Sequence, residues 1–219
     1  EGAATRDNVD QAVQLRVQVA DLLREEVNRL VLERPAPAAG QTGKGRLYYT
    51  AHLRYYLPVE EVKALDRGIL VHREYELVEA PGKPITEAKV GDVIRVKLTL
   101  VAPYSLYYLV VEDPLPPGCE AIDVSLQTTS GAYEQGPRVE RVGEKEWWSW
   151  WWLPSHAELR DEKVVLFASY LRAGTYEYTY LMRASLPGEF LTMPAQAYEM
   201  YFPEVFGRSD GGRFTVAGE

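Results

Sequence analysis

The chain has 219 residues, of which 46% are hydrophobic and 26% charged, and its formal net charge is −8 at pH 7. This balance excludes wholesale disorder, and the acidic charge disfavours binding to the phosphates of nucleic acids. The single cysteine, Cys119, excludes an internal disulfide and a multi-cysteine zinc site, and no apolar run approaches the roughly 20 residues that cross a bilayer.

The aromatic and turn-forming residues favour an all-β fold. The chain has 15 tyrosines and 5 tryptophans but only 5 phenylalanines, and Tyr and Trp suit sheets with one wet face. Its 14 prolines and 17 glycines are spread along the chain as turn signals. Residues Glu1–Asp10 lack a basic start and an apolar stretch, so we expect no signal peptide there.

The N-terminal region predicts strands separated by a loop. Apolar and polar residues alternate over Ala12–Val19, which is the pattern of a half-buried strand. The segment Asp21–Arg34 fits either a helical stripe or a second strand. Pro35–Gly45, rich in proline and glycine, predicts a loop. Arg46–Leu57 predicts a further strand, which Pro58 ends.

The rest of the chain predicts an antiparallel β-sandwich. Val59–Gly68 is polar and predicts a connector, and residues 125–146 predict a long loop or a pair of loose strands. Between turn signals, strands follow one another at the spacing of a sandwich. These strands are Ile69–Val78, Val93–Ala102, Leu106–Glu112, Trp147–Trp152, Val164–Tyr170 and Tyr176–Arg183. In the last of them Tyr176, Tyr178, Tyr180 and Met182 share a face.

The titratable residues do not assemble a recognisable active site. His52, His72 and His156 are isolated in sequence, which favours ordinary strand or loop positions. His156, Glu158 and Asp161 could be drawn as a metal cluster, but a surface turn is the better interpretation. Neither a phosphate-binding glycine loop nor a Gly-x-Ser-x-Gly elbow is present. We therefore expect no enzyme, no cofactor and no metal.

Cys119 follows a proline-rich turn and invites comparison with a protein thioester. Such a bond needs a glutamine three residues after the cysteine, whereas this chain has Ile122 there. The missing acyl donor excludes this chemistry at Cys119. A small packed hydrophobic residue is the better interpretation.

All five tryptophans lie within six positions, and two interpretations of this cluster remain. On a strand some of the rings face outward, where they could stack on sugar rings. Alternatively, the strand contacts the core on one face and a neighbouring domain on the other. The residues are Trp147, Trp148, Trp150, Trp151 and Trp152.

Several segments together resemble the bacterial alpha-2-macroglobulin family. Gly45–Leu53 resembles the G-x-LYY-x-x-x-L strand near the end of that family's CUB domain. Val111–Glu120 resembles the family's V-x-D-P-L-P-x-G-x-E, and Gly174–Tyr180 continues the match. Pro194–Ser209 is similar to the segment before the family's last strand. The order and spacing of these segments carry the resemblance.

The resemblance implies a domain organisation and a function. Residues 1–58 would be the C-terminal half of a CUB-like β domain, which favours strands over a helix for residues 21–34. Residues 59–68 would be a connector, and residues 69–219 a macroglobulin-like or fibronectin-III-like sandwich of the receptor-binding type. The chain would then be a non-catalytic part of a broad-range peptidase inhibitor. That parent would be periplasmic or extracellular, or anchored to a membrane through its N-terminal part.

The resemblance also implies partners and contact residues. The sandwich would pack on a helical domain that holds a thioester, beside other macroglobulin domains of the same parent. The parent protein as a whole, and not this chain alone, would bind target peptidases. In the family an aromatic and methionine-bearing loop contacts the thioester region, and Tyr198, Met200 and Tyr201 occupy the matching stretch. The alternative is that these residues belong to the domain's own core. A competing function is a carbohydrate- or cell-surface-binding sandwich that uses the tryptophan cluster.

Overall fold

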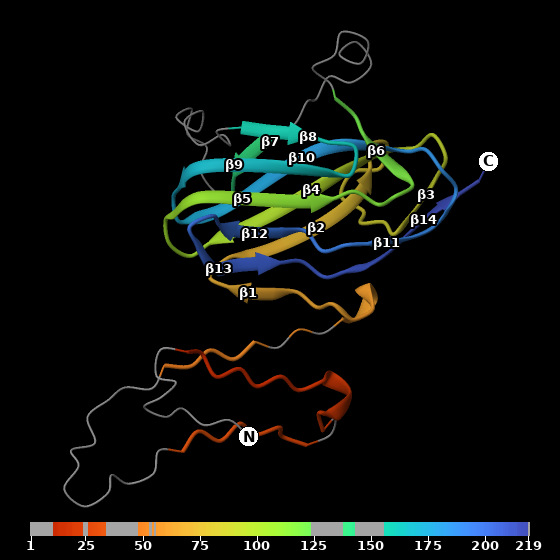
Figure 1. Cartoon of the computed structure of the whole chain (residues 1–219). Helices are drawn as coiled ribbons and strands as arrows, with labels where there is room; N and C mark the ends of the chain where they lie inside the picture. The colour runs from red at the N-terminus through yellow and green to blue at the C-terminus, as the bar shows by residue number, and fades with distance from the viewer. Residues whose placement is uncertain are drawn as a thin grey trace, which may run out of the picture. The chain divides into compact units, whose positions relative to one another are not determined.

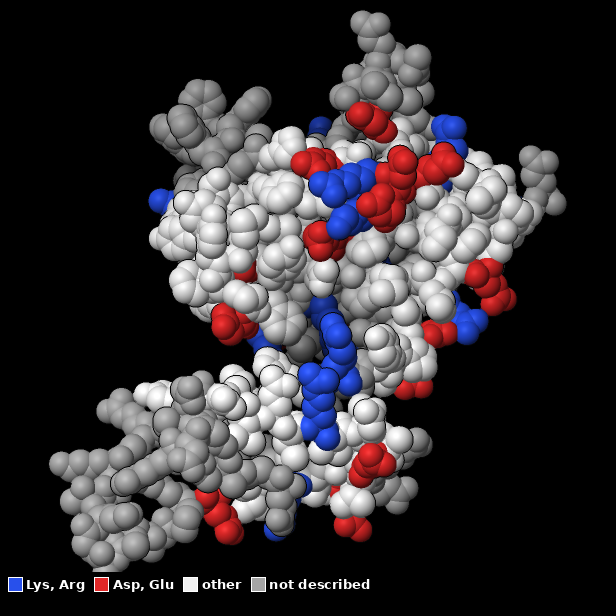
Figure 2. All heavy atoms as spheres, viewed as in Figure 1, with Lys and Arg blue, Asp and Glu red and all other residues white. Residues whose placement is uncertain are grey.

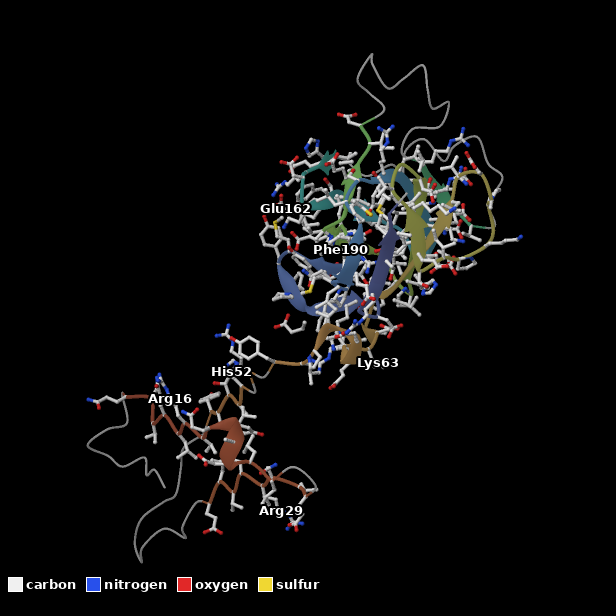
Figure 3. The ribbon with its side chains drawn as sticks, turned by 90° about the vertical axis from the view of Figure 1, so that its right-hand side faces the viewer. Arg16, Arg29, His52, Lys63, Glu162 and Phe190 are labelled. Atoms are coloured by element: carbon white, nitrogen blue, oxygen red, sulfur yellow. The ribbon has the colours of Figure 1, made fainter. Side chains whose placement is uncertain are left out.

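The chain divides into two compact units, Glu1–Tyr56 and Leu57–Glu219. A computed structural model describes residues 11–23, 26–33, 48–52, 54, 56–123, 138–142 and 156–218. Arg16, Arg29 and His52 belong to the first unit, and Lys63, Glu162 and Phe190 to the second (Figure 3). No helix in the described part of the chain has the length and hydropathy to cross a membrane.

The first unit contains one short regular element, the 3₁₀ turn η2 (Val19–Asp21), among its described residues. The strands predicted over Ala12–Val19 and Arg46–Leu57 are not formed where the structure describes them. A strand needs a hydrogen-bonding partner, and the described residues of this unit supply none. Between residues 21 and 34, the described positions form neither a helix nor a strand beyond η2.

The second unit is a β-sandwich with an added small sheet. Sheet A has six antiparallel strands in the order β1 (Leu65–Arg67), β13 (Phe202–Arg208), β12 (Gln196–Glu199), β5 (Leu106–Pro114), β9 (Lys163–Leu171) and β8 (His156–Leu159). Sheet B has the order β2 (Leu70–Leu77), β4 (Val93–Ala102), β10 (Gly174–Ala184) and β6 (Cys119–Ala121), with β7 (Arg138–Arg141) also paired to β10. Sheet C contains β11 (Gly188–Thr192), β14 (Gly212–Ala217) and β3 (Glu87–Lys89). The 3₁₀ turn η3 (Val59–Glu61) precedes β1, and Figure 1 shows the strands of sheets A and B stacked as two layers.

The core fills the space between sheets A and B, and alternation along the strands explains it. On β4 every second residue from Ile94 to Ala102 is buried. On β10 the predicted face of Tyr176, Tyr178, Tyr180 and Met182 is buried as well. Full burial of a large apolar side chain such as Leu98 stabilises the fold by about 1.5–3 kcal/mol. The prediction of an antiparallel β-sandwich is confirmed.

Several short strands occur where the sequence predicted none, and two of them, β1 and β8, replace an expected connector and an expected turn. The polar stretch expected as a connector contains β1, whose three residues pair with β13. The expected surface turn at His156 contains β8, which pairs with β9. Both lie at the edges of sheet A, where a strand of three or four residues is too short for a period-two pattern to be visible.

A buried ion pair connects the two sheets, and its arginine also bonds to the segment that precedes β12. Nη1 of Arg73 on β2 lies 2.6 Å from Oδ1 of Asp113 on β5, and both side chains are almost fully buried. The Tyr180 hydroxyl donates to Oδ2 of Asp113 over 2.7 Å. Arg73 also donates to the backbone oxygen of Met193, 2.8 Å away, in the segment before β12. Burial raises the pKa of the Asp113 carboxyl, and the charge of Arg73 opposes that rise.

Candidate functional site

The β12–β13 hairpin places Met200 and Tyr201 at its tip. Glu199 pairs with Phe202, so these two residues form the connection. Connections of this length favour glycine and asparagine, which adopt positive φ easily. Neither Met200 nor Tyr201 has a positive φ, and a register shift after Tyr198 accommodates the turn instead. The conformational requirements of the turn therefore do not explain why positions 200 and 201 are occupied by methionine and tyrosine.

The structure separates the three contact residues that the sequence predicted. Met200 and Tyr201 are together at the hairpin tip, with 49% and 66% of their surfaces exposed. Neither belongs to the core of this unit. Tyr198 is half-buried in the middle of sheet A, where it pairs with Val110 of β5 and Phe206 of β13. Burial raises the pKa of its hydroxyl.

Further exposed aromatic side chains, which sequence reasoning missed, surround this hairpin tip. The Tyr108 ring on β5 meets the Tyr201 ring edge to face, with centroids 5.1 Å apart. Tyr107 lies against Tyr170 of β9, also with centroids 5.1 Å apart. We call the group that shares this end of sheet A the aromatic patch. It consists of Tyr107, Tyr108, Tyr170, Met200, Tyr201 and Phe202, each at least 40% exposed.

Backbone and carboxylate hydrogen bonds join the two strands that carry the patch. The Met200 N–H donates to the backbone oxygen of Tyr108 over 3.0 Å. One residue earlier on each strand, the buried Glu199 side chain accepts the Tyr107 N–H over 2.6 Å through its Oε1. Tyr108 has a φ of 52°, the only positive value for a non-glycine residue in the described part of the chain. The start of β5 is thus tied to the hairpin in an uncommon backbone conformation.

The patch is poor in charge compared with the rest of the same face. In Figure 2 the part of the second unit over the start of β5 and the β12–β13 hairpin, on the left of the view, is mostly uncharged. Charged side chains gather instead over β8 and the adjoining part of β9. There Arg160 pairs with Glu158, and Lys163 pairs with Glu112. None of the six patch residues is charged, so covering their side chains removes no charged group of the patch from water.

Two of the three candidate metal residues, His156 and Glu158, have other interactions. Glu158 accepts hydrogen bonds from Arg160 and lies 3.2 Å from Nε2 of His156. The hydrogen bond from Arg160 lowers the pKa of Glu158. Within the described residues no group of three His, Cys, Asp or Glu side chains could hold a metal ion. His72 lies on β2, 3.3 Å from Glu74, and His52 lies in the first unit.

The other two predicted features, the tryptophan cluster and Cys119, provide no reactive group among the described residues. Trp147, Trp148, Trp150, Trp151 and Trp152 all lie outside the described residues. Cys119 is buried on β6, as its sequence context predicted, and burial raises the pKa of its thiol to about 11. A thiol of this kind is protonated and unreactive at neutral pH.

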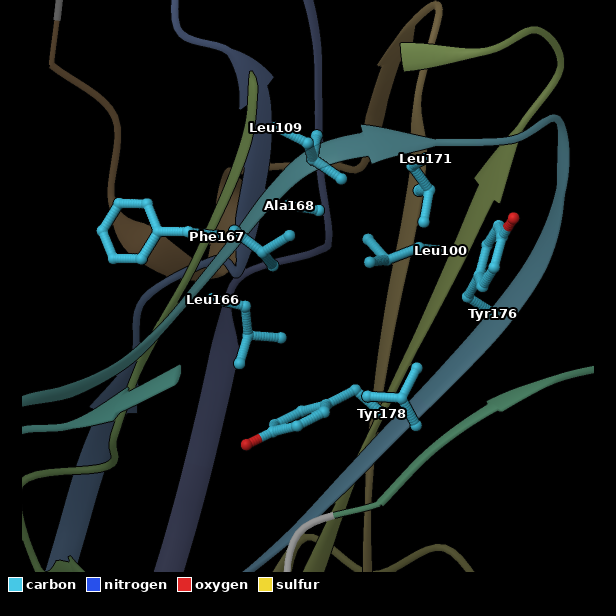
Figure 4. A pocket seen from close by; sticks show the side chains of 10 residues that line it. Leu100, Leu109, Leu166, Phe167, Ala168, Leu171, Tyr176 and Tyr178 are labelled. Carbon is cyan, nitrogen blue, oxygen red and sulfur yellow. The ribbon is translucent and has the colours of Figure 1, made fainter. Parts of the chain in front are cut away.

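A small pocket between sheets A and B is apolar and unsuited to catalysis. It has a volume of about 30 Å³. Figure 4 shows its side chains converging from both sheets. They are Leu100, Leu109, Val111, Val139, Leu166, Phe167, Ala168, Leu171, Tyr176 and Tyr178. The Tyr178 hydroxyl is buried without a hydrogen-bond partner among the described residues, and no acid or base faces it across the pocket lining.

Sequence comparisons relate the chain to large bacterial proteins. Residues 68–204 match the family model described as the bacterial alpha-2-macroglobulin MG10 domain. An alpha-2-macroglobulin homolog from Nostoc sp. is 28% identical over 180 residues, which cover 77% of this chain and 9% of that protein. The alpha-2-macroglobulin of Thermotoga maritima is 31% identical over 143 residues, which cover 64% of this chain and 8% of that protein. The chain thus spans less than a tenth of these relatives.

Solved structures share the fold of the second unit. A fragment of native Escherichia coli alpha-2-macroglobulin, spanning domain MG7 to the C-terminus, aligns with a TM-score of 0.56 and 20% identity. That alignment covers 70% of this chain and 24% of the fragment. Salmonella alpha-2-macroglobulin reacted with methylamine aligns with a TM-score of 0.55 and 21% identity, over 71% of this chain and 10% of that one. At this level of identity the alignments support the sandwich architecture.

Proposed function

Since this chain belongs to the bacterial alpha-2-macroglobulin family, we propose that its second unit is a non-catalytic shield within a broad-range peptidase inhibitor. The aromatic patch packs on the helical thioester-type domain of the same parent and excludes water from the thioester. The observation that carries this proposal is the exposure of Met200 and Tyr201 at a hairpin tip where turn chemistry does not call for them.

The composition of the patch suits a contact between protein domains. Tyrosines supply large, rigid contact areas at a low cost in side-chain entropy, and methionine adapts to irregular apolar surfaces. An activated acyl group hydrolyses unless its surroundings are poor in water. A surface of uncharged rings and one thioether excludes water without leaving a buried charge unpaired.

The same proposal assigns the remaining parts of the chain. Residues 1–58 are the C-terminal half of a CUB-like domain, and residues 59–68, which include β1, lead into the sandwich. The exposed apolar side chains of the first unit, Val13, Leu15 and Val17 among them, support a sheet whose other strands come from elsewhere in the parent. Other macroglobulin domains of the parent adjoin this chain. The parent as a whole binds target peptidases, and it acts in the periplasm or outside the cell.

Methylamine uptake by the parent protein tests the shield. Methylamine attacks the acyl carbon of a thioester and releases a thiol, so its uptake measured by mass spectrometry reports access to that bond. We expect Met200→Ala and Tyr201→Ala to raise the uptake rate on the order of tenfold, as the loss of about 1.4 kcal/mol of protection would.

Met193→Ala is the matched control. Met193 is 51% exposed, against 49% for Met200, but it lies in the segment before β12 rather than at the hairpin tip. Its substitution should leave the uptake rate unchanged. Equal rates in all variants, or a parent that takes up no methylamine, would overturn the proposal.

A further inference from the structure

Tyr108 adopts a backbone conformation that its residue type disfavours. At a φ of 52° the Cβ atom crowds the backbone, and glycine or asparagine would be accommodated more easily. The ring does not compensate by filling the core, since 53% of the residue's surface is exposed. A strained, exposed aromatic residue is therefore not explained by folding alone, and such residues are concentrated at functional sites.

The contacts of Tyr108 link it to the hairpin tip. Its ring meets that of Tyr201 edge to face at an interplanar angle of 89°, and its carbonyl accepts the Met200 N–H. Immediately before it, the Tyr107 N–H donates to the carboxylate of Glu199. Two hydrogen bonds and one ring contact thus join residues 107–108 to residues 199–201.

Glu199 supplies the side-chain hydrogen bond that joins the start of β5 to the end of β12. It is 7% exposed and is one of four buried polar or charged residues among those described. Its Oε1 lies 2.6 Å from the Tyr107 nitrogen. A charged acceptor forms a stronger bond to a backbone N–H than a neutral one does, which suits Glu199 to hold the start of β5 against the end of β12.

We propose that Tyr108 is a contact residue of the same interface as Met200 and Tyr201, and that Glu199 is the positioning residue that holds Tyr108 and Tyr201 as one rigid surface. This inference rests on the proposed function, because the partner is the thioester-type domain of the parent. A surface that is already ordered loses less side-chain freedom when it docks.

Tyr108→Gly separates this role from a purely structural one. Glycine relieves the backbone at positive φ and removes the ring. We expect the melting temperature of the isolated chain to stay the same or rise, while methylamine uptake by the parent increases several-fold. Leu191→Ala is the control, because Leu191 is a 45% exposed apolar residue on β11, in sheet C, and its uptake rate should match that of the wild type.

A pair of substitutions at Glu199 tests the positioning role. Gln retains an oxygen that accepts the Tyr107 N–H, whereas Leu does not. We expect Glu199→Leu to abolish the nuclear Overhauser contact between the Tyr108 and Tyr201 rings and to raise methylamine uptake several-fold. Glu199→Gln should preserve the ring contact and restore most of the protection. If the Leu variant does not fold, Glu199→Gln and Tyr108→Gly still decide the matter.

The outcomes distinguish this inference from the proposed function. If Met200→Ala and Tyr201→Ala accelerate uptake but Tyr108→Gly does not, the inference is wrong and the shield stands. If Tyr108→Gly lowers the melting temperature and raises uptake together, Tyr108 has a structural role and the inference is again wrong. If none of these variants accelerates uptake, the proposed function itself fails.

Discussion

At the residue level, the buried interaction between Arg73 and Asp113 joins the two sheets of the sandwich. The two charges are 4% and 1% exposed, and they join a strand of sheet B to a strand of sheet A. Asp113 accepts a second hydrogen bond from Tyr180, so its removal leaves two buried donors without their partner. We expect Asp113→Ala to lower the free energy of unfolding by about 3–5 kcal/mol, measured by urea denaturation.

A double substitution is the control for this prediction. Arg73→Met combined with Asp113→Leu removes both charges and leaves apolar groups of similar size. Its free energy of unfolding should lie well above that of Asp113→Ala. A double variant as unstable as the single one would mean that packing, and not an unpaired buried charge, causes the loss.

Some residue-level features could be predicted from the sequence, and others could not. The alternation in Val93–Ala102 predicted β4 with its observed bounds, because a strand buried on one face repeats every two residues. The exposed Met200 and Tyr201 were found only through the family resemblance. No sequence pattern marked Tyr108, since a positive φ in a non-glycine residue follows from tertiary contacts. The partner of Glu199 is 92 positions away in the chain, which no local pattern can specify.

At the level of elements, Gly207 is required where β13 passes the short segment between β1 and β2. A Cβ built on Gly207 would lie 1.8 Å from the backbone oxygen of Ile69, so either β13 or that segment must move. We expect Gly207→Ala to lower the free energy of unfolding by about 3 kcal/mol, the upper end for overpacking. Gly218→Ala is the control, because its Cβ would meet no atom within 4 Å. Equal thermal midpoints for the two variants would contradict this account of the close approach.

The outer face of sheet B makes stability depend on pH. On β2, Glu74 lies 3.0 Å from the Lys97 ammonium of β4, and Glu76 lies 2.8 Å from the Arg95 guanidinium. The hydrogen bond from Lys97, with a smaller one from His72, lowers the pKa of Glu74. Burial opposes the shift at Glu76, but the Arg95 and Gly82 hydrogen bonds lower its pKa overall.

The sign of this pH dependence follows from the lowered folded-state pKa values. A carboxyl whose pKa is lower in the folded state stabilises the fold above its ordinary value of 4.5, and this contribution is lost as the pH falls through the folded-state pKa. We expect each pair to contribute about 0.5 kcal/mol. The difference in urea midpoint between pH 7 and pH 3 should shrink in Glu74→Gln and in high salt; an unchanged difference would exclude this pair as a source.

At the scale of the whole chain, the described residues of the two units differ in how far they satisfy one another's backbone groups. Every described strand of the second unit finds its partners within residues 65–217. In the first unit the described segment 11–17 makes no backbone hydrogen bond to another described residue, and the Gln18 carbonyl accepts only the Asp21 N–H of η2. Its apolar side chains, Val13, Leu15 and Val17, are about half exposed. Under the proposed assignment of residues 1–58 to half of a CUB-like domain, we expect other parts of the parent to supply the neighbouring strands.

Hydrogen exchange tests that assignment. In this chain the amides of residues 11–18 should exchange at close to the unprotected rate, while those of β4 and β10 exchange only through unfolding, because they are paired on both sides in sheet B. In the intact parent, the amides over residues 12–19 should become protected by about a hundredfold, since a strand inside a CUB-like sheet donates its successive N–H groups alternately to its two neighbours. Protection of β4 should not change between the two proteins, which controls for differences in solution conditions. Unprotected amides at residues 12–19 in the parent would show that this segment pairs with no other strand there, and the CUB-like assignment of residues 1–58 would be wrong.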